Sequence, residues 1–352
     1  MKTREYELDF LKVVATILIM FHHYQQDTRV FFEGKINFFN GKFYFGLVVE
    51  LFFILSGYFM YDYIKKIEEG YPFPKFYVKR LVRFFPLLFI SAACYEVILN
   101  WFEQVFLYKW SDISISLWGL IITSLGIQAG WSLDNPVINN PTWYISVLML
   151  CYVIFYFLIY IAKRLNLKVE YLFIVMIFIG MGIRDFGLNL PFLNASSCRG
   201  YYAFFFGVLF AEFLRKHKIT KKETLICGLV PIILTLLIVY TECLMVKGID
   251  YVMTFVYYPA LIIFCKYGIG NILNHPFIGL MGKISFDVFI WHHPVNMFMI
   301  IAIYRFNIPC NIYRFRTMLI YALICWVVGT ISYICIDKPI AGLIKRKFKY
   351  IS

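Results

Sequence analysis

The chain has 352 residues, of which 61% are hydrophobic, 20% are aromatic and only 16% are charged, and its net charge is +13. Soluble domains are about half apolar and about a quarter charged, so this composition excludes an ordinary soluble protein and favours a polytopic membrane protein. The basic residues fall between apolar runs, as the positive-inside rule requires, and no DNA- or RNA-binding motif is present. We therefore expect a lipid bilayer, and no nucleic acid, as partner.

The apolar runs predict ten transmembrane helices, because a span needs about 20 mostly apolar residues. In chain order they cover residues 8–26, 45–64, 82–101, 142–162, 170–188, 199–214, 224–245, 251–266, 284–303 and 316–337. Basic clusters lie at 2–4, 65–80, 163–168, 215–222, 266–283 and 345–349. Ten spans place all these clusters on one side, so both termini are expected in the cytoplasm. We predict one all-α domain over residues 1–352, in the cytoplasmic membrane of the cell.

One further apolar stretch, at residues 114–131, does not fit this count. If it crossed the membrane, every later loop would change sides and the basic clusters would face outward. We therefore expect a non-spanning helical or re-entrant element here, which covers a cavity on the outer face.

The first span, LDFLKVVATILIMFHHY, contains Lys12, His22 and His23. An ionisable residue inside a span costs about 2.5–3.5 kcal/mol, so each is a functional candidate. Lys12 and His23 are eleven positions apart, so they share one helix face and lie about 16 Å apart along the axis. His22 points about 100° away from His23. The alternative is that Lys12 snorkels to the headgroups and His23 only marks the helix end.

The second span carries Glu50 at about the depth of His23. A carboxylate beside an imidazole holds the ring in one tautomer and stabilises its protonated form, so we expect Glu50 to orient His23. The alternative is an internal ion pair that only locks two helices together. Ser56 and Gly57 follow on this span, where small residues let helices pack closely. Ser56 is also a candidate for lining a tunnel.

Two arginines, Arg80 and Arg83, precede the third span at its cytoplasmic end. Their i, i+3 spacing lets both point the same way, and guanidinium groups suit the geometry of phosphate. We expect them to hold a phosphorylated cofactor. The alternatives are that they bind anionic lipid or only follow the positive-inside rule.

Two later spans add further candidates. The fourth span opens with Trp143, either a tunnel residue or an ordinary interfacial aromatic. The ninth span carries His292 and His293 in mid-membrane and Asp287 nearer the cytoplasm. We expect His292 to face a polar cavity and His293 to be a core histidine with satisfied hydrogen bonds, while Asp287 orients a basic group.

Five stretches, in this order, resemble the acyltransferase-3 family of integral-membrane acyltransferases over nearly the whole chain. The first has a basic residue, ten positions and a histidine, with Lys12 where the family usually has arginine. The fourth lacks the glutamate that many members have near Leu148, so that role does not carry over. The other four stretches are VVELFFILSGYF, RLVRFFP, PTWYISVLMLCY and MGKISFDVFIWHHPV.

The resemblance implies ten spans and the transfer of an acyl group, with acetyl expected, from cytoplasmic acyl-CoA to a hydroxyl of an extracytoplasmic carbohydrate or cell-surface glycan. Glycan-assembly proteins are candidate partners. The thioester supplies the driving force, so no metal is expected, and the His and Cys spacing contains no zinc pattern.

The predicted site follows from these residues. His23 is the general base or a transient acyl carrier, and Glu50 balances its charge. The donor is held by Lys12, Arg80 and Arg83, and the tunnel is lined by Trp143, His292 and Ser56.

Two other functions stay open. One is a small-molecule or ion transporter, although the first two spans lack a Gly/Pro break and the chain shows no repeat. The other is a non-catalytic ligand-binding membrane module.

Overall fold

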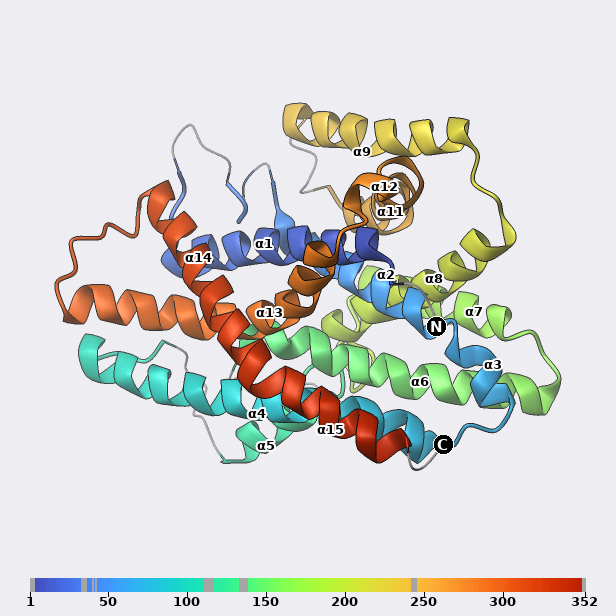
Figure 1. The fold of residues 1–352 in the computed structure, drawn as a ribbon, viewed down its shortest axis with the longest axis horizontal. Helices are drawn as coiled ribbons and strands as arrows, with labels where there is room; N and C mark the ends of the chain where they lie inside the picture. The colour runs from blue at the N-terminus through green and yellow to red at the C-terminus, as the bar shows by residue number, and fades with distance from the viewer. Residues whose placement is uncertain are drawn as a thin grey trace.

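The computed structural model describes residues 4–32, 37–39, 41, 43–110, 117–132, 139–241 and 246–349, and this part of the chain is helical with no named strand (Figure 1). The helices before residue 200 are α1 Tyr6–Thr28, η1 Phe45–Leu47, α2 Val48–Met60, α3 Tyr63–Glu68, α4 Phe73–Phe106, α5 Leu117–Leu125, η2 Asn140–Thr142, α6 Trp143–Leu165, α7 Val169–Phe186 and α8, which begins at Ala195 and ends at Lys216. The later ones are α9 Lys221–Thr241, α10 Ile249–Val252, η4 Met253–Tyr257, α11 Tyr258–Ile263, η5 Phe264–Gly268, α12 Gly270–Leu273, α13 Pro276–Arg305, α14 Phe315–Ser332, η6 Tyr333–Asp337 and α15 Lys338–Lys349.

Six helices of the described chain are long and apolar enough to cross a membrane. They are Phe73–Phe106, Asn140–Leu165, Lys221–Thr241, Ile249–Gly268, Pro276–Arg305 and Phe315–Ile344. The other predicted spans correspond to α1, to η1 with α2, to α7 and to α8, which are shorter or less apolar than these six. A multi-pass helical membrane protein is therefore confirmed, while the number ten and the cytoplasmic position of the termini stay predictions.

Helix ends that are distant in the sequence gather at two ends of the bundle. In Figure 1 both chain ends lie toward the right of the view, where α3 and the connection from α6 to α7 also lie. The long connection from α13 to α14 lies at the opposite end.

The stretch predicted not to cross the membrane contains α5, a helix of nine residues, which rises only about 14 Å. Residues 114–116 of that stretch lie outside the described residues.

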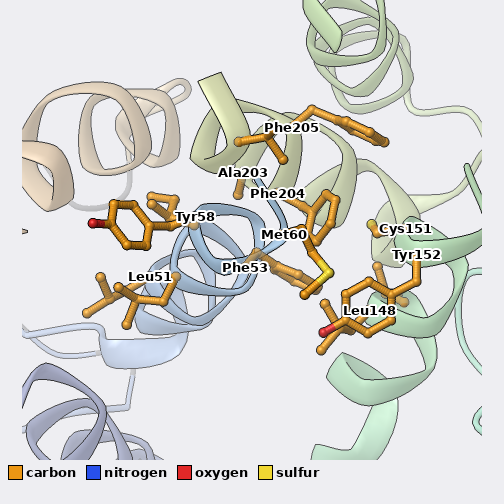
Figure 2. Close-up of a cluster of buried hydrophobic side chains, with 14 of the residues drawn as sticks. Leu51, Phe53, Tyr58, Met60, Leu148, Cys151, Tyr152, Ala203, Phe204 and Phe205 are labelled. Atoms are coloured by element: carbon orange, nitrogen blue, oxygen red, sulfur yellow. The ribbon is translucent and has the colours of Figure 1, made fainter. Parts of the chain in front are cut away.

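Two glycines allow α2 and α8 to pack backbone against backbone. A Cβ added at Gly57 would overlap the carbonyl oxygen of Phe204, and one at Gly207 would overlap the carbonyl oxygen of Ile54. The close approach predicted at Gly57 is therefore confirmed. Figure 2 shows the buried aromatic and aliphatic side chains that α2 and α8 share with α6, among them Phe53.

The helices α1 and α13 lie side by side and run in the same direction. Near its start, α1 places Asp9 where a side chain at Gly282 of α13 would stand. Further along, the hydroxyl of Thr16 approaches the carbonyl oxygen of Ser285 at 3.5 Å. This parallel register carries the histidines near the end of α1 to the same level as those in the second half of α13.

Candidate active site

A cavity of about 570 Å³ opens among the first halves of α1, α4 and α13 and the second half of α2. Its volume is within the range of small-molecule sites. Its charged lining residues are four cations and two carboxylates: Arg4, Lys12, Arg83, Lys283, Glu5 and Asp9. The rest of the wall is mainly apolar and aromatic: Phe52, Leu55, Phe59, Met60, Phe84, Tyr144, Leu148, Tyr152, Phe286 and Phe289.

Lys12 lies in the wall of this cavity. Its ammonium group is 3.2 Å from Oδ1 of Asp9 and 4.6 Å from the centre of the Phe59 ring. Asp9 also pairs with Nε of Arg4 at 2.5 Å. The position of Lys12 fits contact with a ligand in the cavity, and its role toward a cofactor stays a prediction.

The two arginines of the third span do not point the same way, which corrects the expectation that both grip one ligand. Arg80 is 8% exposed and donates to the carbonyl oxygen of Phe76 at 2.5 Å. Its guanidinium lies 3.7 Å from the ring centre of Phe76, 4.5 Å from that of Tyr63 and 4.9 Å from that of Tyr152. Arg83 is exposed and lines the cavity. Only Arg83 of this pair is therefore placed to meet a phosphate.

A cluster of imidazoles, His23, His292 and His293, joins α1 to α13 beyond the aromatic wall of the cavity. The ring of His23 is 5.2 Å from that of His292 and 5.6 Å from that of His293. Phe289 lines the cavity, lies one helical turn before His292, and has its ring 5.7 Å from the His292 ring. The inner wall of the cavity therefore contacts the imidazole cluster.

Each imidazole of the cluster is held by a hydrogen-bond acceptor. Nδ1 of His23 lies 2.8 Å from Oε1 of Gln26, and Nδ1 of His292 lies 2.6 Å from the carbonyl oxygen of Phe289. Because an amide oxygen only accepts, both Nδ1 atoms carry the proton, and each Nε2 keeps a free lone pair. Nε2 of His292 is buried with no partner among the described residues. The arrangement can therefore take up a proton from a bound hydroxyl.

Sequence reasoning missed the carboxylate that contacts this cluster, Asp27. Its Oδ1 lies 3.1 Å from Nε2 of His293, and its Oδ2 accepts from Nδ2 of Asn296 at 2.7 Å. Its side chain is only 6% exposed. Asp27 follows His23 by four residues, so helical spacing alone places it on the same face. His293, expected in a satisfied core position, has a buried Nδ1 without a partner among the described residues.

His22 contacts the ring of His23, at 5.2 Å between centroids, but no ring contact joins it to the described histidines of α13. Its Nδ1 lies 2.7 Å from the carbonyl oxygen of Phe38, and its ring contacts Phe39 and Tyr44 at centroid distances of 5.4 and 5.1 Å. His23, rather than His22, therefore meets the histidines of α13.

Glu50 is fully buried, but it pairs with Arg199 instead of His23. Nε of Arg199 donates to Oε1 at 2.6 Å, and its Nη2 donates to Oε2 at 2.7 Å. The hydroxyl of Tyr202 donates to Oε1 at 3.2 Å. The expectation that Glu50 orients the His23 ring is wrong, because its carboxylate faces α8, where it accepts from Arg199 and Tyr202. The alternative reading, an ion pair that joins two helices, fits the contacts.

The remaining candidates divide between two regions. Ser56 lines the cavity, and its hydroxyl is 2.9 Å from that of Tyr144. Trp143 does not line this cavity, and its ring lies 5.0 Å from the guanidinium of Arg199. His292 touches the wall only through its neighbour Phe289. Asp287 accepts from the hydroxyl of Ser332 at 2.7 Å, so the described residues show no basic group hydrogen-bonded to it.

A second cavity, of about 490 Å³, lies at the end of the bundle where α2 and α8 begin. Its charged lining residues are Glu50, Arg184, Arg199 and Asp250, and Tyr202 donates to both Glu50 and Asp250. Of these four, only Glu50 is a candidate predicted from the sequence. Arg199 is the first residue of a predicted span, and that position is the only sequence signal for it.

Comparison with known proteins gives one result. No curated protein and no solved structure matches the chain. A family model described as an acyltransferase domain matches residues 5–337. Because this match covers nearly the whole chain, the protein belongs to the acyltransferase-3 family and is a membrane acyltransferase.

Proposed function

We propose that the chain moves an acyl group, acetyl in the first instance, from cytoplasmic acyl-CoA to a hydroxyl of a carbohydrate on the outer side of the cytoplasmic membrane. One observation carries this proposal: a cavity with a cationic rim has an inner wall that touches an imidazole cluster. Loop charge supports the direction, because the rim residues lie at the end of the bundle predicted to be cytoplasmic.

The donor would enter with its phosphates at the rim. Neither Arg83 nor Lys283 forms an ion pair with any described residue, so both are free to bind an anion. The pantetheine arm would follow the aromatic wall toward Phe289. The axial distance from Lys12 to His23 is about 16 Å, a suitable depth for an extended thiol arm.

The chemistry follows from the free lone pair on Nε2 of His23. This nitrogen takes the proton of the acceptor hydroxyl while the hydroxyl oxygen attacks the thioester carbonyl carbon. The C–S bond then breaks, and the departing CoA thiolate takes the proton from the imidazolium. The alternative is a transient acyl group on His23 that the hydroxyl then removes. Through His293, the Asp27 carboxylate places a negative charge beside the cluster that stabilises the imidazolium.

The test is transfer by the purified full-length chain in liposomes. Radiolabelled acetyl-CoA is enclosed, a glycan mixture is added outside, and base-labile label on the glycan is counted. His23→Ala should lower the rate about 10²- to 10⁴-fold, the contribution of a general base. His217→Ala is the matched control, since its imidazole pairs with Glu223 at the surface and lines neither cavity.

Two results would contradict the proposal. If His22→Ala abolishes transfer while His23→Ala stays active, the base is assigned to the wrong residue. If His23→Ala retains full activity, or if the liposomes take up the glycan without any need for acyl-CoA, a binding module or a transporter replaces the enzyme.

A further inference from the structure

The second cavity holds features that the proposed reaction does not use. Its guanidinium groups, Arg184 and Arg199, are each paired with a buried carboxylate, Asp250 and Glu50 respectively. Glu50 is 0% exposed and Asp250 is 3% exposed. These pairs come from four helices, α2, α7, α8 and α10, so the cavity is built by the fold rather than by one local motif.

Asp250 has an unused acceptor in this wall. Its Oδ2 pairs with Nε of Arg184 and receives the Tyr202 hydroxyl at 3.4 Å. Its Oδ1 is buried and has no partner among the described residues. A buried carboxylate oxygen without a donor costs free energy, which a ligand donor recovers when it binds. Because Asp250 lines the cavity, this oxygen marks a place for a ligand N–H or O–H group.

The charge of the wall indicates which ligand fits. The two cationic and two anionic side chains balance, so the cavity offers no net attraction to a phosphate or a carboxylate. It offers instead several fixed donors and acceptors, which suit a neutral molecule with many hydroxyl groups. Its volume of about 490 Å³ accommodates one or two sugar rings.

The cavity also adjoins the imidazole cluster. Nη2 of Arg199 donates to the carbonyl oxygen of Gly46 at 2.7 Å, and the ring of Tyr44 lies against Gly46. Tyr44 in turn contacts His22, whose ring is 5.2 Å from that of His23. The rings of Tyr44 and His22 therefore link the wall of the second cavity to His23 of the cluster.

We propose that this cavity binds the neutral, hydroxyl-rich part of the carbohydrate acceptor, with Oδ1 of Asp250 accepting a sugar hydroxyl. The inference rests on the proposed function for the identity of the acceptor, but binding itself needs no acyl-CoA. The cavity holds the glycan, and one of its hydroxyls reaches toward His23. The occupants of the two cavities thus approach the cluster from opposite ends of the bundle.

The experiment measures binding of a fluorescently labelled neutral oligosaccharide, prepared from the surface polysaccharide of the producing cells, to the purified full-length chain without acyl-CoA. Asp250→Asn should weaken binding about tenfold, since it replaces a charged acceptor. Ala195→Phe is a second variant: Ala195 is exposed on the cavity wall, so a ring there blocks the space and leaves both ion pairs intact. It should weaken binding by at least as much.

Asp62→Asn is the matched control, because Asp62 pairs with Arg215 at 2.6 Å and lines neither cavity. It should bind the oligosaccharide as the unchanged chain does, and all three variants should bind acetyl-CoA normally. If Asp250→Asn and Ala195→Phe both bind the oligosaccharide as tightly as the chain without substitutions, the inference is overturned. It is also overturned if the chain without substitutions binds no oligosaccharide or prefers an acidic one. A chain that binds oligosaccharide but never acetylates it would refute the proposed function and leave this inference standing.

Discussion

The two cavities have similar volumes, about 570 and about 490 Å³, but their walls differ in net charge. The wall of the first carries two more cations than carboxylates. In this wall Glu5 forms an ion pair with Lys266, and Asp9 forms ion pairs with Arg4 and Lys12. Arg83 and Lys283 have no ion-pair partner among the described residues. The wall of the second is neutral, because each guanidinium has its own buried carboxylate.

The unpaired cations of the first cavity are available to a ligand, whereas the paired charges of the second stabilise the fold. An unpaired cation at an open rim costs little, since water and counter-ions solvate it until an anion binds. A buried ion pair is different, because removing one partner strands the other in a low dielectric. We therefore expect variants of the first cavity to change donor affinity, and variants of the charged pairs in the second to change stability as well.

The largest effect on stability is expected for Glu50→Gln. It leaves Arg199, whose side chain is 25% exposed, without the carboxylate that receives two of its N–H groups. The loss should be about 3–5 kcal/mol of unfolding free energy, as for other broken buried pairs. Thermal unfolding of the purified chain in detergent, followed by tryptophan fluorescence, measures it.

The control for this prediction is Asp62→Asn, which breaks a pair whose side chains are 31% and 38% exposed. That loss should be about 1 kcal/mol or less. Equal losses in the two variants would show that the Glu50 pair contributes no more than a surface pair, and the contrast between the cavities would disappear.

A pair of variants in one motif gives the next largest effect. Arg83→Ala removes an exposed cation from the rim, so it should raise the KM for acetyl-CoA about tenfold and leave thermal stability unchanged. Arg80→Ala removes a guanidinium packed against three rings, so it should lower stability by about 2 kcal/mol with little change in KM. If both variants raise the KM equally at unchanged stability, Arg80 also contacts the donor, and the two arginines bind one ligand together.

This pair of arginines shows what the sequence predicts and what it cannot. Their spacing predicts a shared helix face, but the choice between cavity and core depends on Tyr63 and Tyr152, which come from elsewhere in the chain. The apolar runs predict the helices well, because a lipid environment imposes long apolar helices. Breaks such as the π-turns at 253–257 and 264–268 leave no comparable signal.

Helical spacing relates candidate residues on one helix, but it does not give the contacts between helices. Lys12 and His23 share a helix, so periodicity alone relates them, and the same rule would have found Asp27. Glu50 was assigned to His23 from depth in the membrane, but depth does not say which neighbour a side chain faces. Its partner, Arg199, is 149 residues away, and only the packing of α2 on α8 brings them together.

The smallest expected effect is that of salt concentration on ligand affinity at the two cavities. Between about 0.1 M and about 1 M salt the Debye length falls from about 10 Å to about 3 Å, which screens exposed charges. The affinity for acetyl-CoA should then fall about three- to fivefold, because the free cations Arg83 and Lys283 stand at an open rim. The affinity for the neutral oligosaccharide should change less than about twofold, because that wall is neutral and the carboxylates of its ion pairs are buried. Equal salt sensitivity of the two ligands would mean that both bind at one charged surface, and the division of the molecule into a donor end and an acceptor end would fail.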